Sequence, residues 1–228
     1  AIHSSSNMLE QSLFGASIEA ENTEFTLSSE PLPGNEPLDD SQPRGPPAGG
    51  DNLLIATVNS GTPGATLDLS DPSVAASVDA LLTEALAIWQ AYADATGDAA
   101  LQAALSTLGT VVVTTDTDGT FNQFQLATAV ANTITLDADA GGYGWFIDAT
   151  PDANEEFETV AGSDVLAATT SDAENGVDLL TVLLHEIGHL LGYGHDAAND
   201  DALMAESLDR GVRLMPQASL DSTVAGTA

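Results

Sequence analysis

A predicted helix that carries two histidines constrains the fold of this 228-residue chain more than any other feature. Asn175 offers an N-cap, Asp178 favours the first turn through its negative charge, and an apolar run follows through Leu191. His185 and His189 lie four residues apart on this helix, so both imidazoles point to one side. The helix must therefore bury an apolar face in the core and present its two imidazoles together on another.

The residues after this helix add a third histidine. Gly192 tolerates the left-handed conformation that ends a helix, after which the chain can turn back and bring His195 to the first two. Three neutral imidazoles leave one open position on a tetrahedral zinc ion, which is the arrangement of a catalytic site. Glu186 follows the first histidine and can reach a zinc-bound water. The alternative, metal-free surface or core histidines, requires the whole pattern to be coincidental.

The charge balance excludes several classes of partner. The chain has 35 acidic residues and only three basic ones, so its formal net charge is −32. Binding to nucleic acid or to an anionic membrane surface needs a basic face, so we expect neither. The longest apolar stretch, Leu179–Leu184, is too short to cross a bilayer, so we also expect no membrane insertion. The absence of cysteine excludes disulfides and thiolate zinc sites.

The chain divides into two parts by composition. Six of its ten prolines fall between Pro31 and Pro47, which indicates a flexible Pro/Gly-rich tail or linker over residues 1–50. Residues 51–228 have the length and the apolar patterning of one folded domain. Because the chain begins with alanine and shows no signal peptide, we interpret it as a fragment or a processed product.

The apolar patterns in this domain predict an α+β fold. Asp71 caps a long helix that stops at Gly97, and Asp98 caps a shorter one that closes at Gly109. Strands are expected at 53–58, 111–115, 133–137, 143–147 and 165–169. This order predicts a mixed twisted sheet packed on the long helix and on the histidine-bearing helix.

The stretch His185–His195 resembles the long zinc-binding motif of the metzincin endopeptidases. Ala202–Ala205, which contains Met204, is similar to the Met-turn that follows that motif. The closest subgroup is the matrixins, and the runs Gly176–His185 and Gly142–Asp148 resemble matrixin-like modules of large bacterial surface or secreted proteins. The resemblance covers residues 51–215 and implies the metzincin-like zincin fold.

The resemblance also implies a function. The chain would be a zinc endopeptidase that hydrolyses extended protein or peptide substrates, with Glu186 as general base for a zinc-bound water and Met204 as an apolar floor beneath the metal. It would be secreted or displayed on a bacterial-type cell surface, within a larger multi-domain chain whose export signal is not present in this fragment. The negative field of the chain would favour cationic substrates.

Matrixin-like enzymes bind substrate as an extended strand against the edge of the sheet. The matching segment would lie near Gly141–Ile147, where Tyr143, Gly144 and Trp145 are candidates to line the cleft. The aromatic side chains fit the core equally well, because alternation sends neighbours to opposite faces of a strand. The wall beyond the scissile bond would come from Leu208–Leu214.

Two acidic turns are candidates for structural calcium. Asp116 and Asp118 form one, Asp137 and Asp139 the other, and each pair is followed by a turn-permitting glycine. An EF-hand loop that starts at Asp116 would need Glu at its twelfth position, where Ala127 stands. Ordinary acidic turns in an acid-rich chain explain both pairs equally well.

Three alternatives stay open at this stage. The chain could be a zinc-stabilised, non-catalytic adhesion or interaction module of a bacterial surface protein. Residues 1–50 could be an inhibitory propeptide, although not one that blocks zinc through cysteine, because the chain has none. A second, structural zinc held by histidines is not expected, because the only other histidine is His3 in the tail.

Overall fold

The computed structural model describes residues 52–55, 64–116, 118–163, 165–195 and 202–217. These residues all belong to one compact unit, Gly45–Ala228. The tail predicted for residues 1–50 lies outside the described residues, as does the second half of the first predicted strand.

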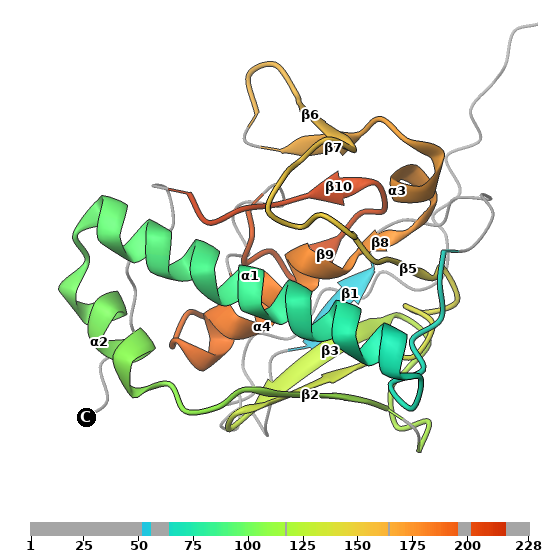
Figure 1. The fold of residues 1–228 in the computed structure, drawn as a ribbon, viewed down its shortest axis with the longest axis horizontal. Coiled ribbons are helices and arrows are strands. Elements are labelled where there is room, and N and C mark those ends of the chain that lie inside the picture. Colours follow the sequence, from blue (N-terminus) through green and yellow to red (C-terminus); the bar gives the residue numbers. More distant parts are fainter. Residues whose placement is uncertain (1–51, 56–63, 117, 164, 196–201, 218–228) are drawn as a thin grey trace, which may run out of the picture. The chain divides into compact units, whose positions relative to one another are not determined.

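The largest element is a five-stranded sheet with the strand order β2-β4-β3-β1-β9 (Figure 1). Its strands are β1 (Asn52–Ile55), β2 (Val112–Thr115), β3 (Gln125–Val130), β4 (Thr133–Leu136) and β9 (Ser207–Leu208). The pairs β2·β4 and β1·β9 are parallel, and the pairs β3·β4 and β1·β3 are antiparallel. The sheet is therefore mixed, as the sequence predicts.

Two small sheets complete the strand inventory of the described residues. The first has the order β10-β7-β6, and the second pairs β5 with β8 in parallel. The strands are β5 (Trp145–Phe146), β6 (Phe157–Thr159), β7 (Leu166–Ala168), β8 (Val177–Asp178) and β10 (Val212–Arg213).

The first two helices have the caps that their sequences predict. In α1 (Pro72–Thr96), the Asp71 side chain accepts a hydrogen bond from the backbone N–H of Ser73, and Gly97 ends the helix with φ +66°. In α2 (Ala99–Thr107), the Asp98 side chain accepts from two backbone N–H groups of the first turn. This second helix ends at Leu108, one residue before the predicted glycine stop.

The helix that carries the histidines starts later than predicted. Asn175 ends the short helix α3 (Ser171–Asn175), and α4 (Leu179–Leu190) is capped by Asp178. The intervening residues are extended, because Val177 and Asp178 pair with β5. A Cβ on Gly176 would lie 2.6 Å from the backbone nitrogen of Phe146, so only glycine allows this close pairing.

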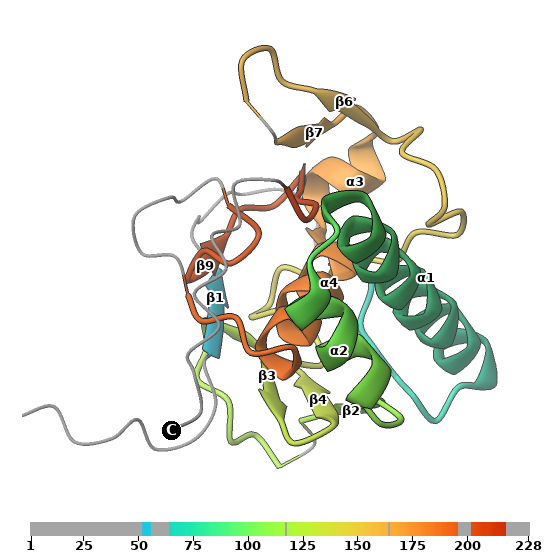
Figure 2. The same cartoon turned by 90° about the vertical axis from the view of Figure 1, so that its left-hand side faces the viewer.

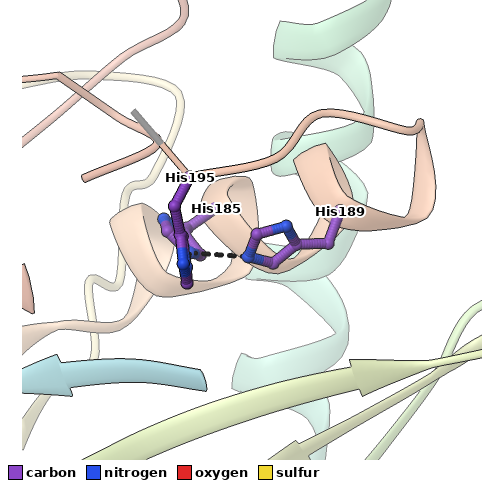
Figure 3. A group of neighbouring side chains, drawn as sticks. All are labelled: His185, His189 and His195. Carbon is purple, nitrogen blue, oxygen red and sulfur yellow. Dashed lines mark hydrogen bonds between the residues drawn. The ribbon is translucent and has the colours of Figure 1, made fainter. Parts of the chain in front are cut away.

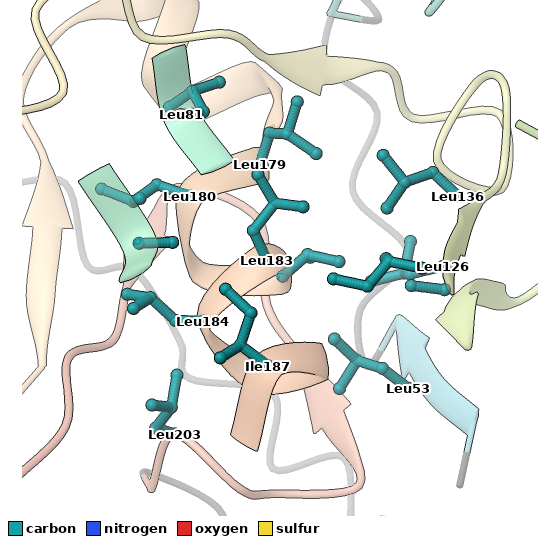
Figure 4. Close-up of a cluster of buried hydrophobic side chains, with 14 of the residues drawn as sticks. Leu53, Leu81, Leu126, Leu136, Leu179, Leu180, Leu183, Leu184, Ile187 and Leu203 are labelled. Atoms are coloured by element: carbon teal, nitrogen blue, oxygen red, sulfur yellow. The ribbon is translucent and has the colours of Figure 1, made fainter. Parts of the chain in front are cut away.

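The core lies on both sides of α4 (Figures 1 and 2). One side packs against α1 and the other against the sheet, mainly β3. Figure 4 shows leucines of α4 between Leu81 of α1 and the leucines of the strands. Every residue from Leu179 to Gly188 is buried, so this helix is held rigidly on several faces.

Among the described residues, α1 is the one helix with the length and composition of a membrane span. Its buried residues recur every three to four positions: Val78, Leu81, Ala85, Trp89 and Ala93. They form an apolar stripe that packs on α4, which is the ordinary pattern of a core helix.

Candidate metal centre

The three predicted zinc ligands come together in the structure. His185 and His189 project from α4, and His195 lies on the segment that turns back after it (Figure 3). The Nε2 atoms of His185 and His189 are 2.9 Å apart, and those of His185 and His195 are 3.2 Å apart. Within the described ranges, this is the one group of three or more candidate metal ligands whose atoms converge.

Backbone carbonyls fix which ring nitrogen faces the centre. His185 Nδ1 lies 2.7 Å from the carbonyl oxygen of Leu203, and His189 Nδ1 lies 3.0 Å from that of Tyr193. A carbonyl oxygen can only accept, so each Nδ1 donates its proton and each Nε2 carries a lone pair. Such an outer hydrogen bond is the usual way a protein orients an imidazole ligand.

These residues fit a zinc ion. Two lone-pair nitrogens 2.9 Å apart repel one another unless a cation or a proton lies between them. Zinc holds imidazole nitrogens at about 2.0–2.1 Å, so tetrahedral ligands stand about 3.3 Å apart, close to the spacings found here. Burial, with the neighbouring His189, lowers the pKa of His185 well below its usual value, which keeps this ligand neutral.

The predicted Met-turn contacts both His185 and the helix that carries it. Leu203, whose carbonyl holds His185, is followed by the buried Met204. A Cβ on Gly188 would lie 2.5 Å from Met204 Sδ and 3.3 Å from Trp89 Cζ2. The glycine inside the histidine motif therefore leaves room for the methionine directly against the helix.

The Trp89 side chain links α1 to α4 and to the residues that follow it. Its Nε1 donates to the carbonyl of Leu184, and its ring stacks on Tyr193 at 5.3 Å between centroids. Burial raises the pKa of Tyr193 to about 12, so the phenol stays neutral. Because the Tyr193 carbonyl accepts from His189, this packing positions the second ligand.

Gly188→Ala should disturb the centre through Met204. The added methyl overlaps the thioether, so we expect a loss of about 1–3 kcal/mol in unfolding free energy and weaker zinc binding. The matched control is Gly194→Ala, where an added Cβ meets nothing within 4 Å. Urea unfolding and a competitive zinc titration measure both effects, and equal behaviour of the two variants would contradict this packing.

Glu186 lies on α4, directly after His185 and before His189 in the sequence. Its side chain is fully buried. On a helix it follows His185 by one position, so it projects from an adjacent face. Its role as the base for a metal-bound water stays a prediction.

A buried arginine, missed in the sequence, anchors the segment after the Met-turn. Arg213 is 0% exposed, and its guanidinium contacts Asp178 at 2.9 and 3.0 Å and Asp148 at 2.7 Å. Its Nη1 also donates to the Asn154 side chain, and the group lies over the Phe157 ring. Burial alone would lower the pKa of Arg213, but the hydrogen bonds with both aspartates outweigh it and raise that pKa.

This cluster links the Met-turn segment to the start of the metal-binding helix. Asp178 caps α4 by accepting from the backbone N–H of Thr181, whose hydroxyl in turn accepts from the N–H of Leu214. The segment 203–214 is thus attached to α4 at two points. Leu203 contacts His185, and Leu214 contacts Thr181 in the first turn of the helix. The scarcity of basic residues in the sequence indicates that an arginine is valuable to the fold, but it does not identify the acids that Arg213 contacts.

The strand predicted to form the substrate cleft is paired on both sides, and the cleft role of Tyr143, Gly144 and Trp145 stays a prediction. Trp145 exchanges two backbone hydrogen bonds with Ala65 on one side, and β5 pairs with β8 on the other. Trp145 is 1% exposed and its Nε1 donates to the Asp137 carbonyl, so its ring belongs to the core. Gly144 is equally enclosed, because a Cβ there would lie 2.3 Å from the Gly64 backbone. The 64–67 segment occupies one edge of this strand and β8 occupies the other.

Tyr143 lies next to this strand and is half-buried. The guanidinium of Arg210 stands over its ring at 5.2 Å, and that arginine also donates to the Asn175 carbonyl. The contact is a cation–π pair between two half-buried side chains.

Neither acidic turn gathers a third metal-ligating side chain in the described part of the chain. Asp116 accepts from the N–H of Asp118 and of Phe121, and these bonds, Phe121 first, lower its pKa. Burial, together with the adjacent Asp139, raises the pKa of Asp137. Both turns are internally hydrogen-bonded, and calcium at either stays a prediction.

The fold and the three-histidine centre define a metzincin-type zinc module. A profile of the matrixin family matches residues 74–220, more than half of the chain. The chain therefore belongs to the matrixin family, which confirms the predicted family and fold class. Searches of curated proteins and of solved structures give no significant match. Family and centre together indicate a zinc-dependent metallopeptidase that acts on proteins or peptides.

Proposed function

We propose that this chain is an endopeptidase that hydrolyses extended protein substrates with a glutamate-activated water. The observation that carries the proposal is the convergence of the His195 imidazole with those of His185 and His189, which lie on the same helix as Glu186. Three neutral ligands leave a position for water and substrate, which a closed structural site would fill with a fourth side chain.

Each residue has a distinct part in this scheme. When bound, zinc supplies a Lewis acid that polarises the scissile carbonyl and lowers the pKa of water. His185, His189 and His195 hold the metal and take no part in proton transfer. Glu186 accepts the proton of the attacking water and passes it to the leaving amine. Met204 packs against Gly188 and so holds in place the helix that carries His185 and His189.

A peptide library tests the proposed activity against the non-catalytic alternative. The zinc-loaded full chain should cleave extended peptides, and cleavage should stop with a strong chelator and return with added zinc. A library that stays intact while zinc is bound would favour an adhesion module stabilised by its metal.

The net charge of −32 supports a preference for cationic peptides. Kcat/KM for a peptide rich in Lys and Arg should fall several-fold between about 0.05 and 0.5 M salt, because added ions shorten the screening length. A neutral peptide of equal length is the control and should change little. The same salt response for both peptides would show that the charge does not steer substrate.

We further propose that the chain acts outside the cell, as a secreted or surface-displayed part of a larger protein. A cysteine-free, strongly acidic peptidase fits an exported bacterial protein that folds without disulfides. Mass spectrometry of culture medium and of protease-shaved intact cells tests this: peptides found only in the cytosolic fraction would contradict it.

A further inference from the structure

A pocket of about 560 Å³ lies beside β5, and none of the three histidines lines it. Its walls come from residues 64–65, from residues 145–147 and from the short helix α3. This helix packs against β5 (Figure 1). The volume lies within the range of about 300–1,000 Å³ that is typical of ligand sites, so the pocket is large enough to hold a side chain of another molecule.

The backbone around this pocket is fixed by close contacts. Trp145 exchanges two hydrogen bonds with Ala65, and β5 pairs with β8 on its other side. A Cβ on Gly64 would lie 2.6 Å from the carbonyl oxygen of Trp145, so a glycine is needed for the wall to approach this closely. The pocket is therefore a preformed feature of the domain.

Phe146 supplies the aromatic surface of the pocket. Successive side chains of a strand point to opposite faces, and that of Trp145 lies in the core, where its Nε1 donates to the Asp137 carbonyl. Phe146 therefore points to the other face, where its ring meets that of Phe157 edge-on at 5.7 Å between centroids. Because Phe146 is only half-buried and lines the pocket, a ligand can pack against it.

The polar groups around the pocket are acceptors. Asp172 is exposed, and its carboxylate has no hydrogen bond or ion pair within the described residues. Asn175 uses its Nδ2 to donate to the Ser171 carbonyl, which leaves its Oδ1 available as an acceptor. The N–H groups of Ala65 and Trp145 are already bonded to one another's carbonyls. Among the residues that the structure describes, no basic side chain lines the pocket, so it favours a cationic ligand with several donors.

An arginine side chain matches this combination. Its guanidinium has five donors and stacks on aromatic rings, and its methylene stem packs on apolar surface. The net charge of −32 adds a long-range attraction for such a cation. The chain's own Arg210 is engaged elsewhere, because it donates to the backbone carbonyl of Asn175 and stands over the Tyr143 ring.

We propose that this pocket binds an arginine side chain of a peptide or protein, with the guanidinium paired to Asp172 and packed against Phe146. Strand β5 pairs with β8, which directly precedes α4, so the pocket has a fixed position relative to the zinc ligands. It therefore selects substrates with an arginine at one set distance from the cleaved bond. This selection rests on the proposed peptidase function, whereas the binding of arginine does not.

A set of fluorogenic dodecapeptides tests whether the position of the arginine matters. Each carries one arginine in an otherwise neutral sequence, and its partner carries citrulline, which has the same shape without the charge, at the same place. At one position kcat/KM for the arginine peptide should exceed that of its partner about tenfold, and elsewhere about twofold or less. An equal ratio at every position would show that only the net charge of the chain acts, and would contradict a fixed pocket.

Asp172→Asn removes the charge from the pocket at an exposed position, so the fold should be kept. It should lower the ratio of arginine to citrulline peptide from about ten to about two. Glu174→Gln is the matched control, because it removes an exposed acid of the same helix that does not line the pocket, and the ratio should stay unchanged. Equal ratios in these two variants would overturn the proposal.

Phe146→Leu tests the aromatic surface separately. Loss of the ring should lower the same ratio about threefold. Circular dichroism first checks that the chain is folded, because Phe146 also packs on Phe157. If this variant unfolds, Asp172→Asn and its control decide.

Binding of the same peptides to the full chain with Glu186→Gln separates the pocket from the peptidase function. In fluorescence anisotropy the arginine peptide should bind about tenfold more tightly than its citrulline partner, and Asp172→Asn in this background should remove most of the difference. That result, with no hydrolysis by the wild type, would support the pocket and refute the peptidase function. Hydrolysis that does not depend on Asp172, with equal binding of both peptides, would overturn the pocket and leave the peptidase function intact.

Discussion

Glu186→Gln is expected to lower kcat for peptide hydrolysis by a factor of about 10²–10⁴, because it removes the group that accepts and returns the proton. The amide has almost the same shape, so the buried site should keep its packing. Zinc content should stay the same, because the three imidazoles are untouched. Initial rates with a fluorogenic peptide, together with metal analysis, measure both quantities.

The control for this variant is His189→Ala, which should lose activity and zinc together. A Glu186→Gln chain that binds zinc and retains near wild-type kcat would contradict the assigned role of the glutamate. Loss of zinc in Glu186→Gln would show instead that the residue acts on the metal site.

Arg213→Met should destabilise the domain by about 3–5 kcal/mol. Removing this cation leaves the buried carboxylates of Asp148 and Asp178 without compensation in an apolar interior. Because Asp178 also caps α4, the start of the metal-binding helix should loosen first. Urea unfolding of the zinc-loaded chain gives the change in free energy.

Two comparisons make this prediction specific. Arg210→Met removes a half-buried cation that stacks on Tyr143, and should cost about 1 kcal/mol or less. Adding Asp148→Asn to Arg213→Met should recover part of the lost stability, since one uncompensated charge disappears. A loss below about 1 kcal/mol for Arg213→Met would show that the ion cluster is replaceable.

The sequence predicts the metal centre well because its information is local. The spacing of His185 and His189, the stop at Gly192 and the return to His195 are set within eleven residues of one helix and turn. The caps at Asp71 and Asp98 are equally local, since each aspartate bonds to the N–H groups of the next few residues. Such short-range patterns need no knowledge of the rest of the fold.

The elements that surround the centre depend on distant partners, and the sequence does not reveal them. Strands β9 and β10 have two residues each, too few for a periodic pattern. The ion cluster joins Arg213 to Asp148 across 65 positions, and nothing in the sequence selects Asp148 and Asp178 among the 35 acids. The pairing of Trp145 with Ala65 is also a tertiary contact, which no local sequence pattern indicates.

One measurement tests the central claim most directly: peptide hydrolysis by the metal-free chain as zinc is added back. Activity should be absent at the start, rise linearly with added zinc, and reach its plateau at one equivalent per chain. Activity that is present without zinc, or a chain that binds one equivalent of zinc at the three histidines and cleaves no peptide, would contradict the account.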